Sequence, residues 1–194
     1  MARGPCRNVV ANRDRSYSVS ICPGISEGNI EIIKAAIGSR KALLVTTPTV
    51  SRLYANTIVS RLIEAGTDVS MLVLSCSERS KVLSEVEKLS QECFSAGLDR
   101  TSVLIGCGGG VCTDLVTMAA ALTRRGLSYF RIPTTLIGLI DAGVGIKGGV
   151  NLPGKKNAIG CFHPPEHVLL DPGFLRRLLP GSCSIDGSRV VSAS

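Results

Sequence analysis

The 194-residue chain has no tryptophan, and aromatic residues make up only 4% of it. Proteins that bind single-stranded nucleic acids without sequence preference stack the bases on aromatic side chains, so this scarcity argues against a nucleic-acid partner. The formal net charge is +7, but the lysines and arginines are spread along the chain rather than gathered in one segment. We therefore expect small anionic ligands, and no nucleic acid.

Long apolar runs are also missing, because no stretch reaches the roughly 20 residues that a membrane helix needs. Residues 1–16 carry charges without an apolar segment behind them, which is not typical of a secretory signal. With 44% hydrophobic and 19% charged residues, the composition is that of a soluble globular protein. We expect a cytoplasmic protein with no membrane partner.

The eight cysteines form no CxxC pair, and most of them lie inside apolar segments. An even number permits a disulfide framework, but the chain is larger than the small domains that depend on one. We expect reduced thiols that pack as small hydrophobic side chains. Both histidines lie in the segment HPPEH, at His163 and His167, where two prolines prevent a regular helix and no third ligand is near. We therefore predict no metal site here.

Buried-strand and helical periodicities alternate along the first 135 residues, with glycines at the joints. Such alternation predicts crossover units, so we expect an α/β fold: a Rossmann-like, doubly wound, mostly parallel sheet. The runs at 41–47 and 68–75 have the composition of strands buried on both faces. The expected strands are 16–21, 41–47, 68–75, 101–106 and 129–133, and the expected helices are 29–37, 50–65, 78–96 and 114–125.

Polar or glycine-rich segments follow four of the expected strands. Because parallel sheets bind ligands beyond the carboxyl ends of their strands, these segments are predicted to share one edge of the sheet. They are TTPT (46–49), SCSE (75–78), GCGGGVCTD (106–114) and PTTL (133–136).

The glycine cluster is the sharpest local signal. Gly106, Gly108, Gly109 and Gly110 are expected to follow a strand and open a helix, where glycine permits positive φ and the close approach of a pyrophosphate. The spacing is neither GxGxxG nor a Walker loop, so a plain strand-to-helix turn is the alternative. Asp114, expected in the first helical turn, either complements the helix dipole or binds a cofactor hydroxyl.

Residues 137–171 are rich in glycine and in isolated charges, which favours a binding loop held by the scaffold. A lysine there can hold a phosphate or a developing negative charge, and a solvated loop is the alternative. After residue 179 no periodicity remains, as in an untethered tail. The charged and amide residues of the loop are Asp141, Lys147, Asn151, Lys155, Lys156 and Asn157.

Motifs in residues 105–179 together resemble the dehydroquinate synthase superfamily of sugar phosphate cyclases; earlier residues are similar only in pattern. The motifs are GGGVCTD, RRG, RIPTTLIGLIDAGVGIK, GKKNAIGCFHPP and LLDPGFLRRL. The form DAGVGIKGGVN is closer to sedoheptulose 7-phosphate cyclases, such as 2-epi-5-epi-valiolone synthase, than to dehydroquinate synthases. The resemblance implies an NAD-binding α/β domain over 1–179 and an unstructured tail over 180–194. It also implies a divalent metal, zinc or cobalt, in a C-terminal helical domain whose ligands match no position here, so we expect that domain to be missing.

The resemblance also implies roles for individual residues. The implied catalytic residues are Asp141, Lys147 and Asn157, and Arg125 is implied to reach the substrate phosphate of a partner subunit in a homodimer. Cofactor contacts are implied for Glu78, Lys81, Gly109, Gly110, Val111, Asp114, Thr134, Thr135, Ile137 and Lys156.

The implied activity is that of an NAD-dependent, phosphate-eliminating cyclase, a carbon–oxygen lyase. We expect sedoheptulose 7-phosphate, a small phosphorylated sugar, as the substrate, with this chain a truncated form. The alternatives are a 3-dehydroquinate synthase of the shikimate pathway and a non-catalytic NAD-binding fragment.

Overall fold

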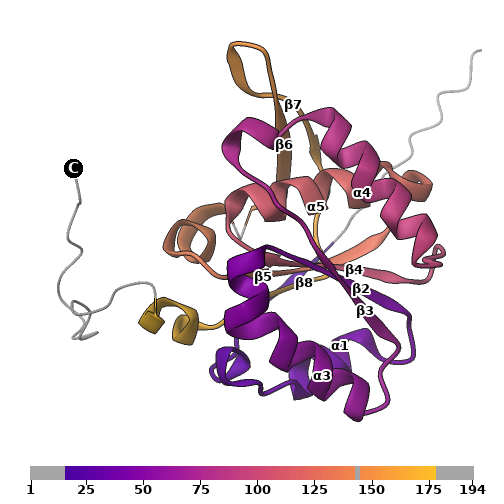
Figure 1. The fold of residues 1–194 in the computed structure, drawn as a ribbon, viewed down its shortest axis with the longest axis vertical. Helices are drawn as coiled ribbons and strands as arrows, with labels where there is room; N and C mark the ends of the chain where they lie inside the picture. The colour runs from indigo at the N-terminus through magenta and orange to yellow at the C-terminus, as the bar shows by residue number, and fades with distance from the viewer. Residues whose placement is uncertain (1–15, 143–144, 178–194) are drawn as a thin grey trace, which may run out of the picture.

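The computed structural model describes residues 16–142 and 145–177. A six-stranded sheet lies between two layers of helices, with α1 and α3 on one face and α4 and α5 on the other (Figure 1). Its order is β1-β8-β5-β4-β2-β3, and every neighbouring pair is parallel. The expected α/β fold with a doubly wound parallel sheet is thus confirmed.

The strands of this sheet are β1 (Ser18–Ile21), β2 (Ala42–Thr46), β3 (Val69–Val73), β4 (Val103–Gly108), β5 (Ser128–Pro133) and β8 (His167–Leu170). The helices are α1 (Glu31–Ile37), α2 (Pro48–Val50), α3 (Asn56–Glu64), α4 (Leu83–Ser95) and α5 (Gly110–Leu122). A π-helical turn, Ser51–Ala55, joins α2 to α3 without a break. No helix in the described part of the chain is long and apolar enough to cross a membrane.

Burial on both faces explains why the first four residues of β2 are all apolar. Ala42 and Leu44 pack into the core beneath α1 and α3, whereas Leu43 and Val45 pack into the core beneath α4 and α5. Successive side chains of a strand point to opposite faces, so a strand covered on both faces needs apolar residues at every position. The expectation of a second such strand over 68–75 was wrong, because β3 lies at the sheet edge and is only partly covered.

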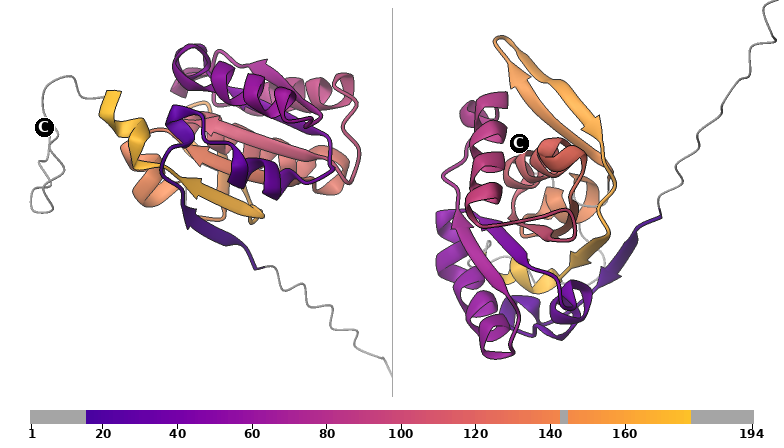
Figure 2. Two further views of the ribbon diagram at one scale, coloured as in Figure 1. Left: turned by 90° about the horizontal axis from the view of Figure 1, so that it is seen from below. Right: turned by 90° about the vertical axis from the view of Figure 1, so that its right-hand side faces the viewer.

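The segment 137–171 is not a loop. Strands β6 (Lys147–Leu152) and β7 (Lys155–Phe162) form an antiparallel hairpin that lies over α5 and projects beyond the helix layer (Figure 2). The chain then returns to the sheet as β8, between β1 and β5, so residues 1–135 do not complete the sheet. Glycine permits the packing of the hairpin, since a Cβ on Gly148 would lie 2.6 Å from Cγ2 of Thr117 on α5.

Two helix starts also differ from expectation. The expected helix 78–96 begins with the 3-10 turn Glu78–Ser80, and α4 starts at Leu83 after an extended Val82. Helix α5 begins at Gly110 rather than at residue 114. Asp114 therefore lies in the second turn, and Gly106 and Gly108 belong to β4 rather than to the connection after it.

Candidate cofactor and substrate site

The carboxyl ends of β2, β3, β4 and β5 meet at one edge of the sheet, as expected, because all four strands are parallel. From β2 the chain continues outward to β3, whereas from β4 it continues outward in the other direction to β5. The strand order therefore reverses between β2 and β4. Open α/β sheets bind ligands in the crevice at such a switch point, and the glycine turn follows β4 directly.

The glycine turn needs glycine for space and not for φ. Gly109 caps α5 in an extended conformation, with φ −77° and ψ −179°, and none of the four glycines of the cluster has positive φ. The expected need for positive φ was therefore wrong, whereas the expected close approach of a pyrophosphate stays a prediction. A Cβ on Gly109 would lie 3.0 Å from Cγ2 of Thr135, whereas a Cβ on Gly110 would meet nothing within 4 Å. Gly110 thus faces open space at the start of the helix.

Two features at this edge fit a bound anion with hydroxyl groups. No side chain in the described part of the chain caps the amino terminus of α5, so its first amides and the positive end of its dipole face outward. Beside them, at the end of β2, the fully buried Oγ1 of Thr46 has no hydrogen-bond partner among the described residues. A dinucleotide supplies both a pyrophosphate and ribose hydroxyls, so these residues suit one.

A polar network joins the segment before α4, helix α5 and the hairpin. Lys81 is only 5% exposed, and its Nζ lies 2.5 Å from Oδ2 of Asp114 and 2.6 Å from Oδ1 of Asn157. Asn151 donates to Oε1 of Glu78 at 2.9 Å and accepts from the amide of Asn157 at 2.8 Å. Four residues expected at the cofactor or the substrate are thereby brought together, with Asn151 as a fifth member.

A cavity of about 380 Å³ lies beside this network, between α5 and the hairpin. Asp114, Lys147 and Asn157 line it, so the structure unites an expected cofactor residue with two expected catalytic residues. Burial raises the pKa of Asp114, while the hydrogen bond and the positive charge of Lys81 oppose that rise. The Asp114 carboxylate at this cavity is thus paired with the buried Lys81, while a second lysine of the lining, Lys147, is exposed.

Other expected site residues are placed less centrally. Val111 is half-buried in the first turn of α5, while Ile137 and Lys156 are exposed. Asp141 lies in the one-turn segment Gly138–Ala142, but its side chain is outside the described structure. Arg125 lies just beyond the carboxyl end of α5, far along the helix from the glycine turn, and does not line the cavity.

Thr134 and Thr135 follow β5 next to the glycine turn. The amide of Thr134 donates to the carbonyl of Gly108 at 3.0 Å, and Oγ1 of Thr135 accepts from the amide of Gly138 at 3.3 Å. The first bond holds the PTTL segment against the end of β4, and the second closes the turn after β5. Their roles, like those of the other site residues, stay predictions.

The sequence analysis did not identify Arg131, which links the hairpin to α5. Arg131 on β5 is fully buried, and Nε and Nη2 donate to Oγ1 of Thr117 at 3.2 and 2.7 Å. Nη2 also donates to the carbonyl of Lys147 at 2.7 Å, and Nη1 donates to the carbonyl of Gly145. The signal was available, because an arginine inside the apolar strand YFRIP must find buried acceptors.

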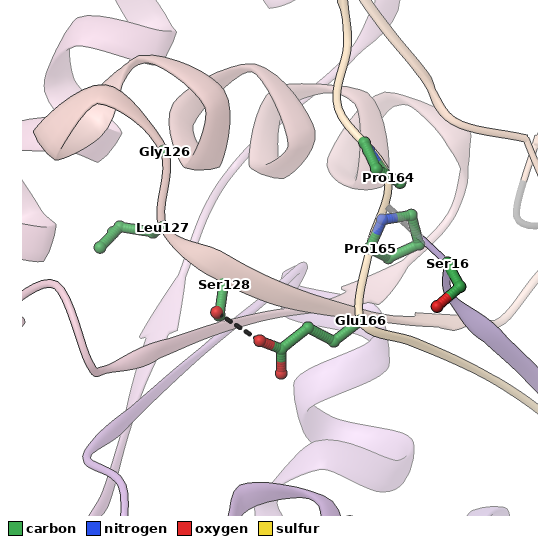
Figure 3. A pocket seen from close by; sticks show the side chains of 7 residues that line it. All are labelled: Ser16, Gly126, Leu127, Ser128, Pro164, Pro165 and Glu166. Carbon is green, nitrogen blue, oxygen red and sulfur yellow. Dashed lines mark hydrogen bonds between the residues drawn. The ribbon is translucent and has the colours of Figure 1, made fainter. Parts of the chain in front are cut away.

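A second cavity, of about 410 Å³, lies at the amino-terminal ends of β5 and β8, where the side chain of Ser128 donates to Glu166 (Figure 3). His163 lies near these strand ends. Its ring is stacked on Tyr129, and its Nε2 lies 3.0 Å from the carbonyl of Leu127, while His167 contacts Ser18. Among the described residues, no three histidine, cysteine, aspartate or glutamate side chains gather as metal ligands do.

Residues 71–184 match the sequence profile of the family described as 3-dehydroquinate synthase N-terminal. The chain belongs to the 3-dehydroquinate synthase family. It is 43% identical over 171 residues to the 3-dehydroquinate synthase of Synechococcus sp. (strain ATCC 27144), a match that covers 87% of this chain and 46% of the relative. It is 38% identical over 164 residues to that of Pelotomaculum thermopropionicum, covering 84% and 44%. The chain thus spans about half the length of the curated relatives it matches.

Solved structures of related enzymes have the same fold. The 2-epi-5-epi-valiolone synthase of Streptomyces hygroscopicus subsp. jinggangensis 5008, solved with NAD+ and Zn2+, superposes with a TM-score of 0.80 at 36% identity. That match covers 87% of this chain and 46% of the enzyme. A 2-deoxy-scyllo-inosose synthase solved with carbaglucose-6-phosphate, NAD+ and Co2+ has a TM-score of 0.74 at 23% identity, covering 83% and 44%, and supports the fold alone.

Proposed function

We propose that this chain is the NAD-binding half of a sugar phosphate cyclase that eliminates phosphate from its substrate. The observation that carries the proposal is the uncapped amino terminus of α5, open at Gly110, at the switch point of the sheet. A pyrophosphate placed there would accept hydrogen bonds from the first amides of the helix. The related valiolone synthase, solved with NAD+, supports the choice of dinucleotide.

Each part of the site has a task in this proposal. The amides of Gly110 and Val111 would hold the pyrophosphate, and Asp114, fixed by Lys81, would accept a hydrogen bond from a ribose hydroxyl. Bound NAD would supply the acceptor for a hydride from a sugar hydroxyl. Lys147 would attract the anionic sugar to the cavity, where Asn157, fixed by Lys81, presents its amide. The described residues offer no metal-binding group, so we derive no step through a metal.

For the substrate we propose sedoheptulose 7-phosphate, on the similarity to the valiolone synthase. A 3-dehydroquinate synthase is the second candidate, because curated relatives of higher identity have that name. Calorimetric titration of each sugar phosphate into the NAD-saturated chain distinguishes them. We expect sedoheptulose 7-phosphate to bind more tightly, and tighter binding of the dehydroquinate precursor would favour the second candidate.

We also propose that the full enzyme is a homodimer. Arg125 adjoins a different cavity from the one that Asp114 and Asn157 line, so it is poorly placed to contact a sugar bound in its own chain. Its backbone, with φ 65°, follows Arg124 with φ 52°, and Gly126 completes the turn with φ 120°. Such strained turns persist where the surroundings hold them, often at functional sites. A partner's cavity would give the exposed guanidinium its phosphate.

The test of NAD binding is the variant Gly110→Ala, measured by isothermal titration calorimetry. Since a Cβ at Gly110 meets no protein atom within 4 Å, the fold should be kept while the methyl group obstructs the pyrophosphate. We expect NAD to bind at least ~10-fold more weakly, about 1.4 kcal/mol, with an unchanged melting temperature. Gly109→Val is a less clean test because it also meets Thr135.

The matched control is Leu122→Ala, at the exposed far end of the same helix, which should leave the NAD affinity unchanged. Asp114→Ala should also weaken binding, through loss of the ribose contact. If the folded chain binds no NAD, or if Gly110→Ala binds it as well as the unmodified chain does, the proposed site is wrong.

A further inference from the structure

One aromatic side chain of the hairpin is exposed beside the cavity that Asp114 and Asn157 line. Phe162, the last residue of β7, is 74% exposed, more than any other large hydrophobic side chain in the described part of the chain. The ring of Phe94 is also exposed, but the guanidinium carbon of Arg124 lies 4.8 Å from its centroid and covers it. A single exposed aromatic residue needs no explanation on its own, but Phe162 is part of a cavity wall.

The register of the hairpin places Phe162 directly opposite Lys147. The amide of His163 donates to the carbonyl of Ile146 at 2.9 Å, which makes Lys147 and Phe162 a non-hydrogen-bonded pair of the antiparallel ladder. In such pairs the two Cα atoms are only about 4.5 Å apart, and both side chains point to the same face. The phenyl ring therefore lies next to the lysine that we expect to attract the anionic sugar.

Glycines leave the surface next to this pair without side chains. Gly149 lies opposite Gly160, two positions along each strand from the pair. Because side chains alternate between the faces of a strand, this position is on the same face as Lys147 and Phe162. The backbone of the two glycines thus forms a shelf beside the ring, which we call the hairpin shelf. Asn157 borders it, since a Cβ on Gly149 would lie 3.5 Å from Oδ1 of Asn157. All five residues line the same cavity of about 380 Å³.

The two glycines of the hairpin shelf are needed for different reasons. A Cβ on Gly160 would lie 2.6 Å from the carbonyl oxygen of Gly148, so the pairing of the strands requires glycine there. A Cβ on Gly149 would make only ordinary contacts, the nearest at 3.5 Å, and Gly149 does not have positive φ. Neither packing nor backbone conformation therefore demands glycine at position 149. The effect of glycine there is to keep the hairpin shelf open.

The groups around the hairpin shelf match the parts of a phosphorylated sugar. The C–H groups of a sugar carry a slight positive charge, which the negative face of an aromatic ring attracts. The exposed ammonium group of Lys147 suits the phosphate. Because Oδ1 of Asn157 accepts from Lys81, the Nδ2 group is the donor that Asn157 can offer to a sugar hydroxyl. Apolar surface with a few placed polar groups is typical of sites for small ligands.

We propose that Phe162 and the hairpin shelf form the subsite for the carbon skeleton of the sugar phosphate, with the phenyl ring stacked on its C–H face. Gly149 sets the room that this subsite offers, so both residues determine specificity. Of the described residues, those of the glycine turn do not line this cavity, so a dinucleotide held at the turn leaves the hairpin shelf to the sugar. The inference rests on the proposed function, which supplies the class of substrate.

The experiment titrates two ligands into the NAD-saturated chain by calorimetry. The first is sedoheptulose 7-phosphate or the dehydroquinate precursor, whichever the unmodified chain binds more tightly, and the second is inorganic phosphate. We expect Phe162→Ala to bind the sugar phosphate about tenfold more weakly but inorganic phosphate equally well, because only the sugar has C–H groups for the ring. Phe162→Trp, which keeps an aromatic face, should retain the affinity. Phe94→Ala, at an exposed phenylalanine outside this cavity, is the matched control and should bind both ligands normally.

Gly149→Ala tests the hairpin shelf without removing any group. Its Cβ fits at ordinary contact distance, so the melting temperature should be unchanged while the methyl group takes up room that the sugar needs. We expect the sugar phosphate to bind at least about threefold more weakly and NAD to bind as before. Normal sugar phosphate binding by this variant would mean that the room at Gly149 is not used.

Equal binding of the sugar phosphate by Phe162→Ala and by the unmodified chain overturns the inference. An equal loss of NAD affinity in Phe162→Ala would place the ring at the cofactor and also overturn it. Phe162 borders the cavity of Arg125 as well, so light scattering is needed: if Phe162→Ala is monomeric where the unmodified chain is dimeric, the ring is an interface residue and the inference is wrong.

The same titrations separate this inference from the proposed function. If the unmodified chain binds NAD but neither sugar phosphate, the hairpin shelf is not a sugar subsite, whereas the NAD site stands. If the unmodified chain binds no NAD, the proposed function has failed, and titration without NAD still decides whether Phe162 contacts a sugar phosphate.

Discussion

Lys81 shows how one residue can organise a site. It is 95% buried, yet its ammonium group contacts both the Asp114 carboxylate and the Asn157 amide oxygen, one on α5 and the other on the hairpin. A buried ammonium group is unfavourable unless its charge is paired and its hydrogen bonds are made. The same contacts oppose the rise that burial causes in the pKa of Asp114. The lysine therefore keeps the carboxylate available for a ligand.

Replacing Lys81 by methionine should be strongly destabilising. The substitution keeps most of the side-chain volume but leaves Asp114 partly buried without its partner, a loss of about 3 kcal/mol for such pairs. The free energy of unfolding from urea titration measures it. Lys88→Met is the matched control, because the ammonium group that pairs with Glu85 is itself exposed, and it should change stability by less than about 0.5 kcal/mol.

A double substitution separates the pair from the lysine alone. Asp114→Asn in the Lys81→Met background removes the uncompensated carboxylate, so part of the lost stability should return. If Lys81→Met is as mild as Lys88→Met, the buried contact does not stabilise the fold. If the double variant is no more stable than the single one, the unpaired carboxylate is not the cause of the loss.

Some of the residues that the resemblance named gather at this site, but how they are held was not predictable. They are Glu78, Lys81, Asp114 and Asn157. Lys81 and Asn157 are 76 positions apart, and their contact exists because the hairpin folds back over α5. Periodicity does not report such long-range polar contacts. Asn157 also adopts φ 49°, which asparagine tolerates better than most residues. The tolerance of asparagine for such a backbone could be anticipated from the sequence, but it did not indicate that the side chain of Asn157 contacts Lys81.

At the scale of elements, the hairpin depends on Arg131 and Thr117. The guanidinium lies beneath the start of β6 and links the backbone at Lys147 to Oγ1 of Thr117 on α5. Thr117 in turn donates to the carbonyl of Thr113 one turn earlier in the helix. The hairpin is thus held through a chain of hydrogen bonds with a buried charge at its centre. Its position decides where Lys147 lies relative to the cavity.

Thr117→Val tests this anchor with a nearly isosteric change. Valine keeps the methyl group that packs against Gly148 but cannot accept from Arg131. Hydrogen bonds to charged groups contribute about 1.5–3 kcal/mol, so we expect a loss of about 2 kcal/mol and faster amide hydrogen exchange in residues 147–152. Thr57→Val, on the exposed surface of α3, is the control. Unchanged exchange in the hairpin would contradict the anchoring role.

The elements themselves were partly predictable. Strands β2 and β4 were found because full burial favours an apolar run, and that pattern is readable. Strand β5 shows the same pattern on either side of its buried Arg131. The start of α4 was not, because the Ser77–Ser80 capping box supports a 3-10 turn that breaks the helical pattern. Strand β8 was missed because it is four residues long and follows two prolines, where a loop is the ordinary interpretation.

On the scale of the whole molecule, Glu166 ties the elements that meet at the edge opposite the glycine turn. It precedes β8, accepts from Oγ of Ser128 at the start of β5 at 2.5 Å, and pairs with Arg40 beyond α1 at 2.8 Å. Arg40 also donates to the carbonyl of Ala36 in α1 at 2.6 Å. One carboxylate therefore links the central sheet to a covering helix.

This link should make the stability depend on pH. Burial alone would raise the pKa of Glu166, but hydrogen bonds from Ser128 and Arg40 and the nearby positive charges outweigh it and lower that pKa below the usual 4.5. Hydrogen bonds from Thr101 and Ser102 likewise lower the pKa of Asp99 to about 2. A lowered pKa in the folded state means that unfolding takes up protons, so both groups contribute stability that is lost as the pH falls. Asp114, whose pKa is raised, acts in the opposite direction.

Glu166→Gln should isolate the contribution of Glu166. Above pH 4.5 the unmodified chain has an ionised Glu166 in both states and benefits fully from the charged contacts, so the variant should melt lower at pH 7. Because this carboxylate is partly exposed, we expect roughly 1 kcal/mol, or about 2–4 °C. As the pH falls from 4.5 through the folded pKa, that advantage disappears, and the two melting curves should converge. Glu64→Gln, on the exposed surface of α3, should leave the pH profile unchanged. A difference between Glu166→Gln and the unmodified chain that stays constant until the fold is lost in acid would mean that Glu166 acts by packing, not charge.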